Sequence, residues 1–520
     1  MLKKNVAVWG TGNVCTQIFN ENTQMKVDFF IDNDIRKNKK KVFGKKIVHP
    51  SWITDWKKIY IIIAIDNYSS VKEYLSQRGL YEQVDFMWYR DWLFPRNVKQ
   101  ILSEAKQFLT WIDTQNKYNG CKLIFSDFLA FDKGVCDFVN EWNKIEKNMV
   151  LLSEALWVSK ERIEKLHITS IKLPAVLAHN QYLKKSLDGE IDEQLISYVR
   201  ERRYLNEAAV NLRMGYRDMA SDYEYIVCYF ADRIVRKILK CWTPCKVIIW
   251  NAFYALHIIV KEICKEMNIC VQYMEFGNIP GTIIVEEIGQ MGESWPARFP
   301  QKFMRIPVYS SEYTRAEQQI KKLCQSKLNR NVQPYNNLLR DVKKSLKVER
   351  PIVFYAGQND NASGMQPYTE KTKEFHSPMF TSSDEAAVFL ASICKKNSWN
   401  YIYKPHPMMF RWCEQSILPE NTILVDNVDI NELIDLSDIV VTVLSTVSYI
   451  ALIRQKPVVM LGYTQLKSKG CTYEAFRLKD IEKQISAALN NHLTSDMHSK
   501  FVNHVVQLEK YYSNILLEVK

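Results

Sequence analysis

The feature that most constrains this 520-residue chain is a pattern that recurs along it: an apolar strand, a turn of glycine or polar residues, and then a helix. The pattern begins at 5–9, at 246–250 and at 352–356. Another predicted strand, 59–65, is apolar throughout, which is typical of parallel strands that are covered on both faces. Because one core rarely serves more than about 200 residues, the repeated pattern predicts several α/β domains in series.

The first predicted domain covers 1–98 and has the order of a small Rossmann-like domain. Strand 5–9 runs into Gly10, a helix follows, and strand 27–31 ends at Asp32. A strand, a glycine turn, a helix and a second strand that ends in an acid form the order of dinucleotide-binding domains. We therefore expect a parallel sheet with helices in this part of the chain.

The turn of this domain contains the residues that a nucleotide would need. Gly10 and Gly12 would let the backbone approach a diphosphate at the helix N-terminus, where Asn13 stands. Asp32 follows at the spacing expected of an acid that binds a ribose. Cys15 replaces the third glycine of the fingerprint, so the pattern favours the fold over the ligand. A nucleotide or dinucleotide is a candidate ligand of this turn.

Two larger domains are predicted after the first. One covers 117–310 and contains a strand–helix–strand unit, and the other covers 350–490; a helical tail, 491–520, ends the chain. Two α/β lobes in series leave one natural place for a ligand, the cleft that faces the carboxyl ends of both parallel sheets. The expected fold class is therefore α/β, with a small Rossmann-like domain followed by a pair of lobes.

The sharpest motif is Lys404-Pro405-His406-Pro407, which directly follows a predicted strand. Its two prolines stiffen the loop and expose both basic side chains at the carboxyl edge of the sheet. Lys404 and His406 could therefore neutralise a phosphate of a leaving group. The alternative is a stiff surface turn that binds no ligand.

A second motif places hydroxyl groups where a strand passes into a helix. Ser445, Thr446 and Ser448 follow the apolar residues 439–444. Hydroxyl and backbone N–H groups converge at such a helix start, and the helix dipole favours an anion there. A capping role without any ligand is the alternative. In combination with His406, which lies upstream, the motif favours the binding of a phosphate.

These motifs resemble a known family. The segments KPHP at 404–407 and SDIVVTVLSTVSYIALIRQKPVVMLG at 437–462 are similar to the C-terminal lobe of capsule polysaccharide biosynthesis transferases. GQNDNASG at 357–364 and EFGNIPGT at 275–282 look like two further motifs of that family, in the right order. The resemblance covers roughly 245–475. It implies a two-lobed GT-B fold, in which a final helix often returns to the first lobe.

The resemblance also implies a function. The family includes retaining transferases of Kdo, 3-deoxy-manno-octulosonic acid, that use CMP-Kdo. We therefore expect a glycosyltransferase that moves a sugar from a nucleotide-sugar donor, with a CMP-activated ulosonic acid favoured, to a bacterial surface polysaccharide or glycolipid. Residues 1–98 resemble small Rossmann modules that are fused to bacterial surface-polysaccharide enzymes.

Two other functions stay open. The hydroxyl-rich motif also resembles CDP-glycerol polymerases of teichoic acid synthesis, which would make the protein a CDP-alcohol polyol-phosphate transferase. Many GT-B enzymes have a glutamate that grips the nucleotide ribose at the position of Ile450. The absence of this glutamate is also compatible with a non-catalytic assembly protein that keeps the GT-B fold.

Three acids are the candidates for catalysis. Glu275 ends a predicted strand and precedes a glycine turn, and the alternative for it is a capping or surface acid. Glu286 follows nearby, and Asp360 lies on the facing lobe. Paired acids can divide the roles of nucleophile and general acid. The two lobes contain no Asp-x-Asp motif of a metal–nucleotide site, so we expect no metal, with Lys404 and His406 in place of the cation.

Charge and hydropathy bound the partners and the location. The net charge is +12, and basic residues crowd into 36–46 and 321–350. Such segments are either solvated surface or attract anionic lipid headgroups or an acidic polymer. No nucleic-acid motif accompanies them, so we expect no nucleic-acid partner. The chain has neither an apolar run of about 20 residues nor a signal-peptide pattern. We expect a cytoplasmic protein, with peripheral contact to the inner face of the membrane as an option.

Overall fold

The computed structural model describes residues 4–21, 26–65, 68–82, 84–89, 98–126, 133–153, 166–177, 192–215, 221–326, 338–406, 418–426 and 428–512. Contacts divide the chain into two compact units. The first unit consists of Met1–Asn119, Ser126–Val199 and Asp218–Trp242, and the second of Gly120–Phe125, Arg200–Arg217 and Thr243–Lys520. Within the described ranges, no helix is both long and apolar enough to cross a membrane.

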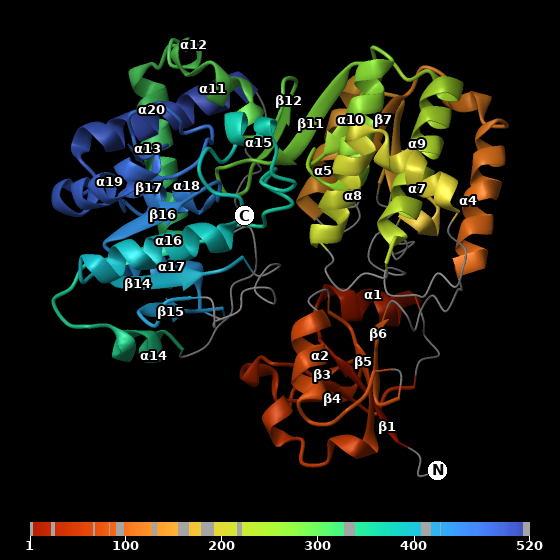
Figure 1. Ribbon diagram of the computed structural model, residues 1–520, viewed down its shortest axis with the longest axis horizontal. Coiled ribbons are helices and arrows are strands. Elements are labelled where there is room, and N and C mark those ends of the chain that lie inside the picture. Colours follow the sequence, from red (N-terminus) through yellow and green to blue (C-terminus); the bar gives the residue numbers. More distant parts are fainter. Residues whose placement is uncertain are drawn as a thin grey trace. The chain divides into compact units, whose positions relative to one another are not determined.

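The first unit begins with a six-stranded sheet in the order β3–β4–β2–β1–β5–β6. Figure 1 draws this part of the chain in red to orange. Its elements are β1 (Asn5–Trp9), α1 (Asn13–Glu21), β2 (Phe29–Ile31), β3 (Lys41–Val42), β4 (Lys45–Val48), β5 (Ile59–Ile63), α2 (Tyr68–Ser76) and β6 (Phe86–Trp88). The strands pair in parallel except in the β3–β4 hairpin. The apolar strand β5 lies in the core of this sheet, and the Rossmann-like prediction is confirmed.

The remainder of the first unit is mainly helical. It contains α4 (Val98–Ile112), α5 (Lys133–Glu146), α7 (Glu193–Arg200) and α9 (Tyr223–Trp242), with the parallel strands β8 (Met149–Ser153) and β9 (Thr169–Lys172). Helix α4 packs against α9, where the ring of Trp111 meets the edge of the buried Trp242 at a centroid distance of 6.2 Å.

The second unit contains strands of two sheets. In one of them, the strands lie in the order β12–β11–β10–β7. They are β7 (Lys122–Phe125), β10 (Lys246–Trp250), β11 (Val271–Phe276) and β12 (Ile283–Glu286), and helices α8 (Arg203–Gly215) and α10 (Ala255–Glu266) accompany them. Strand β10 is parallel to β7 and β11, whereas β12 returns antiparallel to β11. The predicted strand–helix–strand unit is present, and β12 is an addition that the sequence did not indicate.

The other sheet of the second unit is parallel throughout, in the order β15–β14–β13–β16–β17–β18. Its strands are β13 (Ile352–Ala356), β14 (Asn400–Lys404), β15 (Thr422–Leu424), β16 (Ile439–Thr442), β17 (Val458–Met460) and β18 (Tyr473–Glu474). The helices of this part are α11 (Trp295–Arg298), α12 (Pro300–Phe303), α13 (Ser310–Ser326), α14 (Leu338–Ser345), α15 (Glu370–Phe375), α16 (Ser383–Lys396), α17 (Ile430–Leu436), α18 (Val447–Ile453), α19 (Leu478–Asn491) and α20 (Ser495–Tyr512).

Different helices cover the two faces of this parallel sheet, because side chains alternate along each strand. Phe354 and Val440 belong to an apolar cluster with residues of α13, α17, α18 and α20. Their neighbours Val353 and Val441 belong to a second cluster with residues of α16 and α19. Both faces of the strands are therefore buried, which explains why the strands read as continuous apolar runs.

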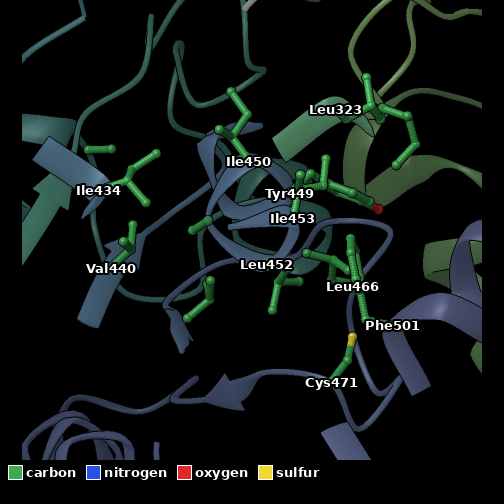
Figure 2. Packing of buried hydrophobic residues seen from close by; sticks show 14 of the residues in the cluster. Leu323, Ile434, Val440, Tyr449, Ile450, Leu452, Ile453, Leu466, Cys471 and Phe501 are labelled. Carbon is green, nitrogen blue, oxygen red and sulfur yellow. The ribbon is translucent and has the colours of Figure 1, made fainter. Parts of the chain in front are cut away.

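Helix α18 lies at the centre of the first cluster. Figure 2 shows its side chains Tyr449, Ile450, Leu452 and Ile453 among the buried residues of this core. Ile450, which stands where many GT-B enzymes have a glutamate, is only 8% exposed. The side chain at this position packs in the core, so recognition of a ribose here would need other residues.

The C-terminal helix α20 packs on α13 and also contacts β12 of the other sheet. Gln507 of this helix donates from Nε2 to the carbonyl oxygens of Met304 and Ile306, at 3.0 and 3.1 Å. A final helix that contacts the preceding lobe is the arrangement expected from the resemblance. The predicted α/β class with a GT-B pair of lobes is confirmed, and the predicted domain limits stay predictions.

Candidate active site

A pocket in the second unit lies at the carboxyl ends of strands from its two sheets. It is lined by the end of β11 and the turn after it, and by the loops that follow β16 and β17. Its polar lining residues are Glu275, Asn278, Ser445, Thr446, Ser448, Thr464 and Gln465. The described residues that line it include no lysine, arginine or histidine. The lining therefore fits a ligand rich in hydroxyl groups, and a cation that acts on such a ligand must come from outside it.

Glu275 reaches this pocket from β11, where its side chain is only 6% exposed. A tight turn follows the strand, and the backbone N–H of Gly277 donates to the carbonyl oxygen of Thr282 at 2.8 Å. A Cβ atom on Gly277 would lie 1.9 Å from Oγ1 of Thr282, so only glycine fits the turn. The turn brings Asn278 into the pocket lining beside Glu275.

The three predicted hydroxyl residues line the same pocket. Ser448 donates to the carbonyl oxygen of Ser445 at 2.9 Å, and Oγ of Ser445 accepts from the backbone N–H of Val447 at 3.4 Å. Thr446 is the N-cap residue of α18, and its side chain makes no capping hydrogen bond. The structure thus brings Ser445, Thr446 and Ser448 together with Glu275, as the sequence analysis expected of a cleft between lobes.

Lys404 and His406 are not among the residues that line the pocket. The ammonium group of Lys404 donates to the carbonyl oxygen of Asp426, and burial lowers the pKa of Lys404 to about 8. His406 is half-buried in the loop after β14, and Pro407 lies outside the described residues.

Strand order explains this separation. Lys404 ends β14 and Ser445 follows β16, but β13 lies between these two strands. Two strand spacings separate the ends by about 10 Å. The motifs share one sheet edge, as expected, but they are not neighbours on it.

Asp360 supports the loop after β13. Its carboxylate accepts from the backbone N–H of Ser383 at 3.0 Å, at the start of α16, and from Nε2 of Gln358 at 3.3 Å. Oε1 of Gln358 in turn accepts from the backbone N–H of Leu444 at 3.2 Å. Asp360 is buried and is not among the pocket-lining residues, so its hydrogen bonds hold the loops behind the pocket.

Glu286 is buried at the end of β12 and faces the C-terminal helix. Its carboxylate accepts from the hydroxyl groups of Tyr511 and Tyr512, at 3.1 and 3.0 Å. The backbone N–H groups of Glu287 and Ile288 donate to it at 3.0 and 3.2 Å. Burial raises the pKa of Glu286, although these hydrogen bonds act to lower it. Glu286 also lies outside the pocket lining.

Two amides of the pocket were missed by the sequence analysis. Nδ2 of Asn278 donates to Oε1 of Gln465 at 2.7 Å, and Nε2 of Gln465 donates to the hydroxyl oxygen of Tyr512 at 2.6 Å. Asn278 lies in the EFGNIPGT motif, which could have pointed to it. Gln465 lies in the loop after β17 and has no sequence signal of its own, because only the fold brings that loop to β11.

A partly buried charge cluster was also missed. Glu293 forms an ion pair with Lys371 at 2.6 Å and lies 3.2 Å from Nε2 of His376. Burial opposes ionisation of Glu293, but the hydrogen bond to His376 and the charges of Lys261 and Lys371 hold its pKa well below its usual range. Glu293 follows the pocket residue Met291 closely in the chain, so this cluster anchors one wall of the pocket.

In the first unit, the glycine turn after β1 is closely packed at Gly10. Gly10 has φ +106°, and a Cβ atom there would lie 2.8 Å from the carbonyl oxygen of Ala64. At Gly12, an added Cβ would meet no atom within 4 Å. Asn13 begins α1, but its side chain lies outside the described part of the structure.

Asp32, the predicted ribose-binding acid, has partners within its own domain. It accepts from Nζ of Lys37 at 2.9 Å, from the backbone N–H of Asp34 at 2.9 Å and from that of Thr11 at 3.2 Å. The hydroxyl group of Thr11 also donates to it. A ribose at this turn would therefore have to compete with Lys37 and Thr11 for the carboxylate.

Comparisons with known proteins agree with this architecture. Residues 305–505 match the family model described as capsule polysaccharide biosynthesis protein, and residues 2–83 match a model described as C2185-like, N-terminal. A search of curated proteins found no match.

Among solved structures, the chain is similar to two structures of Thermosulfurimonas dismutans KpsC. The beta Kdo 2,7 transferase is 16% identical over 52% of this chain and 79% of its own, with a TM-score of 0.35. The beta Kdo 2,4 transferase is 12% identical over 51% of this chain and 80% of its own, with a TM-score of 0.36. UDP-GlcNAc 2-epimerase from Neisseria meningitidis, bound to UDP-GlcNAc, is 9% identical over 76% of this chain and 99% of its own, with a TM-score of 0.29.

The matched residues 305–505 include the whole parallel sheet β13–β18 and the hydroxyl-rich loop of the pocket. The lobe that precedes them has the strand–helix–strand unit expected of a GT-B partner. The match covers less than half of the chain, and it makes residues 305–505 similar to the capsule polysaccharide biosynthesis proteins, within a chain whose two α/β lobes have the GT-B type of fold.

Proposed function

We propose that the protein transfers a CMP-activated ulosonic acid such as Kdo to a bacterial surface polysaccharide or glycolipid. The observation that carries the proposal is the pocket in which Glu275 meets Ser445, Thr446 and Ser448 at the carboxyl ends of two sheets. A carboxylate that faces hydroxyl groups and a helix start can hold an activated sugar by its phosphate and attack its anomeric carbon. The choice of CMP rests on the resemblance of 404–407 and 437–462 to users of CMP-Kdo.

Glu275 has the central role in the proposed reaction. Its carboxylate oxygen attacks the anomeric carbon, the bond from that carbon to the phosphate oxygen breaks, and CMP leaves. A hydroxyl oxygen of the acceptor then displaces the carboxylate and loses its proton to a base, which gives transfer with retention. Alternatively, Glu275 is the acid–base group, and Glu286 or Asp360 is its partner. We place Glu275 first because the other two acids are buried outside the pocket lining.

The donor phosphate is assigned to the start of α18. The hydroxyl groups of Ser445, Thr446 and Ser448 and the positive end of the helix dipole favour an anion there. Lys404 and His406 add positive charge from a strand end about 10 Å away. This charge stabilises the negative charge that develops on the leaving phosphate, in place of a metal ion. Their distance makes this contribution a field effect rather than direct contact.

A donor hydrolysis assay tests the proposal. The full-length protein is incubated with CMP-Kdo, with CDP-glycerol and with UDP-GlcNAc, and the products are separated. The proposed function requires release of CMP together with the free keto-sugar from CMP-Kdo. Turnover of CDP-glycerol alone would favour the polyol-phosphate transferase, and no turnover of any donor would favour a non-catalytic assembly protein.

Peripheral contact with the membrane is a further part of the proposal. The segment 36–46 contains seven basic residues, and it contains the β3–β4 hairpin. Three large apolar side chains of this region are exposed: Ile35 by 54%, Phe43 by 45% and Trp52 by 59%. Nζ of Lys39 lies 5.3 Å from the centre of the Trp52 ring. Basic residues with exposed aromatic and aliphatic side chains fit an anionic bilayer surface.

Vesicle sedimentation tests this contact. Lys45→Glu combined with Lys46→Glu should weaken binding to phosphatidylglycerol vesicles by tenfold or more, because each basic residue near the surface contributes about 1 kcal/mol. Lys395→Glu, on α16 of the second unit, is the matched control. Equal binding of both variants to these vesicles would argue against the hairpin as the contact.

A further inference from the structure

We infer that a directional chain of hydrogen bonds, from Glu286 through Tyr512 and Gln465, fixes Asn278 as a hydrogen-bond acceptor in the pocket, where it selects a substrate hydroxyl group. The inference rests on the proposed function, because it concerns the same pocket. It assigns Glu286, a predicted catalytic acid, the role of a positioning residue.

The direction of the chain begins at Glu286. Its Oε1 accepts from the backbone N–H groups of Glu287 and Ile288, which can only donate, at 3.0 and 3.2 Å. The Tyr511 hydroxyl also donates to Oε1, at 3.1 Å. An ionised carboxylate has no hydrogen to give, so Oε2 likewise accepts, and the hydroxyl group of Tyr512 donates to it at 3.0 Å.

The direction then passes to the two amides. Because Tyr512 gives its hydrogen to Glu286, its oxygen accepts from Nε2 of Gln465 at 2.6 Å. This fixes the orientation of the Gln465 amide and turns its Oε1 towards Asn278. Nδ2 of Asn278 donates to that oxygen at 2.7 Å.

The orientation of Asn278 follows from this contact. With Nδ2 turned towards Gln465, the carbonyl oxygen Oδ1 is the other end of the amide, and it can only accept. Tyr449, which lines the same pocket, has its own partner, because its hydroxyl lies 2.9 Å from Nε2 of the buried His504. The carbonyl oxygen of Asn278 is therefore the end of the amide that is oriented for a ligand.

This result defines the chemistry that the pocket selects. An acceptor favours a hydroxyl group of a sugar and disfavours a phosphate or carboxylate oxygen, which cannot donate when ionised. The described lining contains no cation that would reverse this preference. The sugar ring of the donor therefore lies against Asn278 and Gln465, while the phosphate lies towards Ser445 and Thr446.

Two adjacent tyrosines give a matched first test. Both donate to Glu286, but only Tyr512 contacts Gln465. Tyr511→Phe also keeps the ring that stacks on Trp295 at 4.8 Å. The full-length protein is titrated with CMP-Kdo and with UDP-GlcNAc, and affinity is measured from ligand-induced thermal stabilisation. Tyr512→Phe should weaken binding about tenfold and Tyr511→Phe by less than about twofold.

A reversal of the hydrogen-bond direction gives the second test. In Glu286→Gln, the new amide can donate to Tyr512, which then donates to Oε1 of Gln465. Nε2 of Gln465 would then meet Nδ2 of Asn278, and two donors would face each other. Asn278→Asp supplies the missing acceptor and still offers a second oxygen to the ligand. We therefore expect each single variant to lose affinity about tenfold and the double variant to regain most of that loss.

The outcomes separate this inference from the proposed function. Two results would contradict the directional chain of hydrogen bonds. One is an equal loss of donor affinity in Tyr511→Phe and Tyr512→Phe. The other is a loss in the double variant that equals the product of the losses in the two single variants. If the wild-type protein binds UDP-GlcNAc and not CMP-Kdo, the proposed donor is wrong, and both comparisons are then made with UDP-GlcNAc. If it binds neither sugar nucleotide, the inference falls together with the proposed function.

Discussion

The glycine turn of the first unit and the hydroxyl-rich turn of the second both join an apolar strand to a helix, but their polar groups have different partners. In the first unit, Asp32 accepts hydrogen bonds from Thr11 and Lys37 of the same domain. In the second unit, Thr446 makes no capping hydrogen bond with its side chain, and it lines a pocket together with Glu275.

The difference shows that a nucleotide-type fold does not by itself make a nucleotide site. The local order of strand, turn and helix is the same in both places. What differs is the surroundings of the polar groups at the strand ends. Lys37 forms an ion pair with Asp32 at the first turn, whereas a polar pocket lies between the second turn and the turns after β11 and β17.

The largest expected effect tests the acids of the two regions against each other. Glu275→Gln keeps the shape of the side chain and removes its charge, so donor hydrolysis should fall by about 100-fold or more, which corresponds to about 2.7 kcal/mol in the transition state. Asp32→Asn should leave turnover within about twofold, because its partners Thr11 and Lys37 belong to the first unit. Both rates are measured with the same donor.

Glu287→Gln is the control for Glu275, because Glu287 is exposed and directly follows the neighbouring strand β12. Mass spectrometry of the intact wild-type protein with donor alone would show a sugar adduct if the reaction passes through a covalent intermediate. Near-normal turnover of Glu275→Gln would eliminate both of its proposed roles, and an adduct at Asp360 or Glu286 would eliminate only the nucleophile.

The next effect concerns His406, which shares a sheet edge with the pocket without lining it. His406→Ala should reduce turnover by about tenfold, because a charge about 10 Å from the leaving phosphate contributes at most about 1–2 kcal/mol at an effective dielectric constant of about 20. Thermal unfolding of the variant shows whether the fold survives. Turnover within about threefold of wild type would mean that the cationic loop does not act on the donor, and the comparison would then rest on the hydroxyl residues alone.

A third prediction follows from the buried lysines of the second unit. Burial lowers the pKa of Lys404 and of Lys469 to about 8, whereas the unfolded chain releases these protons near 10.5. Between these values the unfolded state binds more protons, so the free energy of unfolding should rise with pH, by at most about 3 kcal/mol for each lysine. Urea unfolding at pH 8 and pH 10 measures this rise, and Lys404→Met should remove about half of it.

The smallest effect separates the two glycines of the first turn. Gly10→Ala should destabilise the first unit by about 1–3 kcal/mol, since φ +106° strains any side chain and the carbonyl oxygen of Ala64 lies 2.8 Å from the added carbon. Gly12→Ala meets no atom and should change stability by less than about 0.5 kcal/mol. Thermal unfolding of the two variants checks this. Equal stability of both would show that the turn relaxes around the new side chain.

Much of the fold was predictable from local pattern alone. Apolar runs located β1, β5, β10, β13, β14 and β16, and the glycine turn indicated the first sheet. Burial on both faces makes a parallel strand apolar at every position, so its signal is contained in a few consecutive residues. The gathering of Glu275 with Ser445, Thr446 and Ser448 followed from the rule that a ligand cleft faces the carboxyl ends of the strands, here those of two sheets.

Only the tertiary structure decided which of those ends are neighbours. Strand β13 separates Lys404 from the hydroxyl residues. Strand β12 and helix α20 place the carboxylate of Glu286 beside the hydroxyl groups of Tyr511 and Tyr512, and Lys37 donates to the carboxylate of Asp32. Strand order and helix docking depend on contacts between residues that are far apart in the chain. The spacing of apolar residues within one helix or strand does not reveal such contacts. The sequence by itself thus determined the elements and the candidate residues, and long-range packing determined which of them share a site.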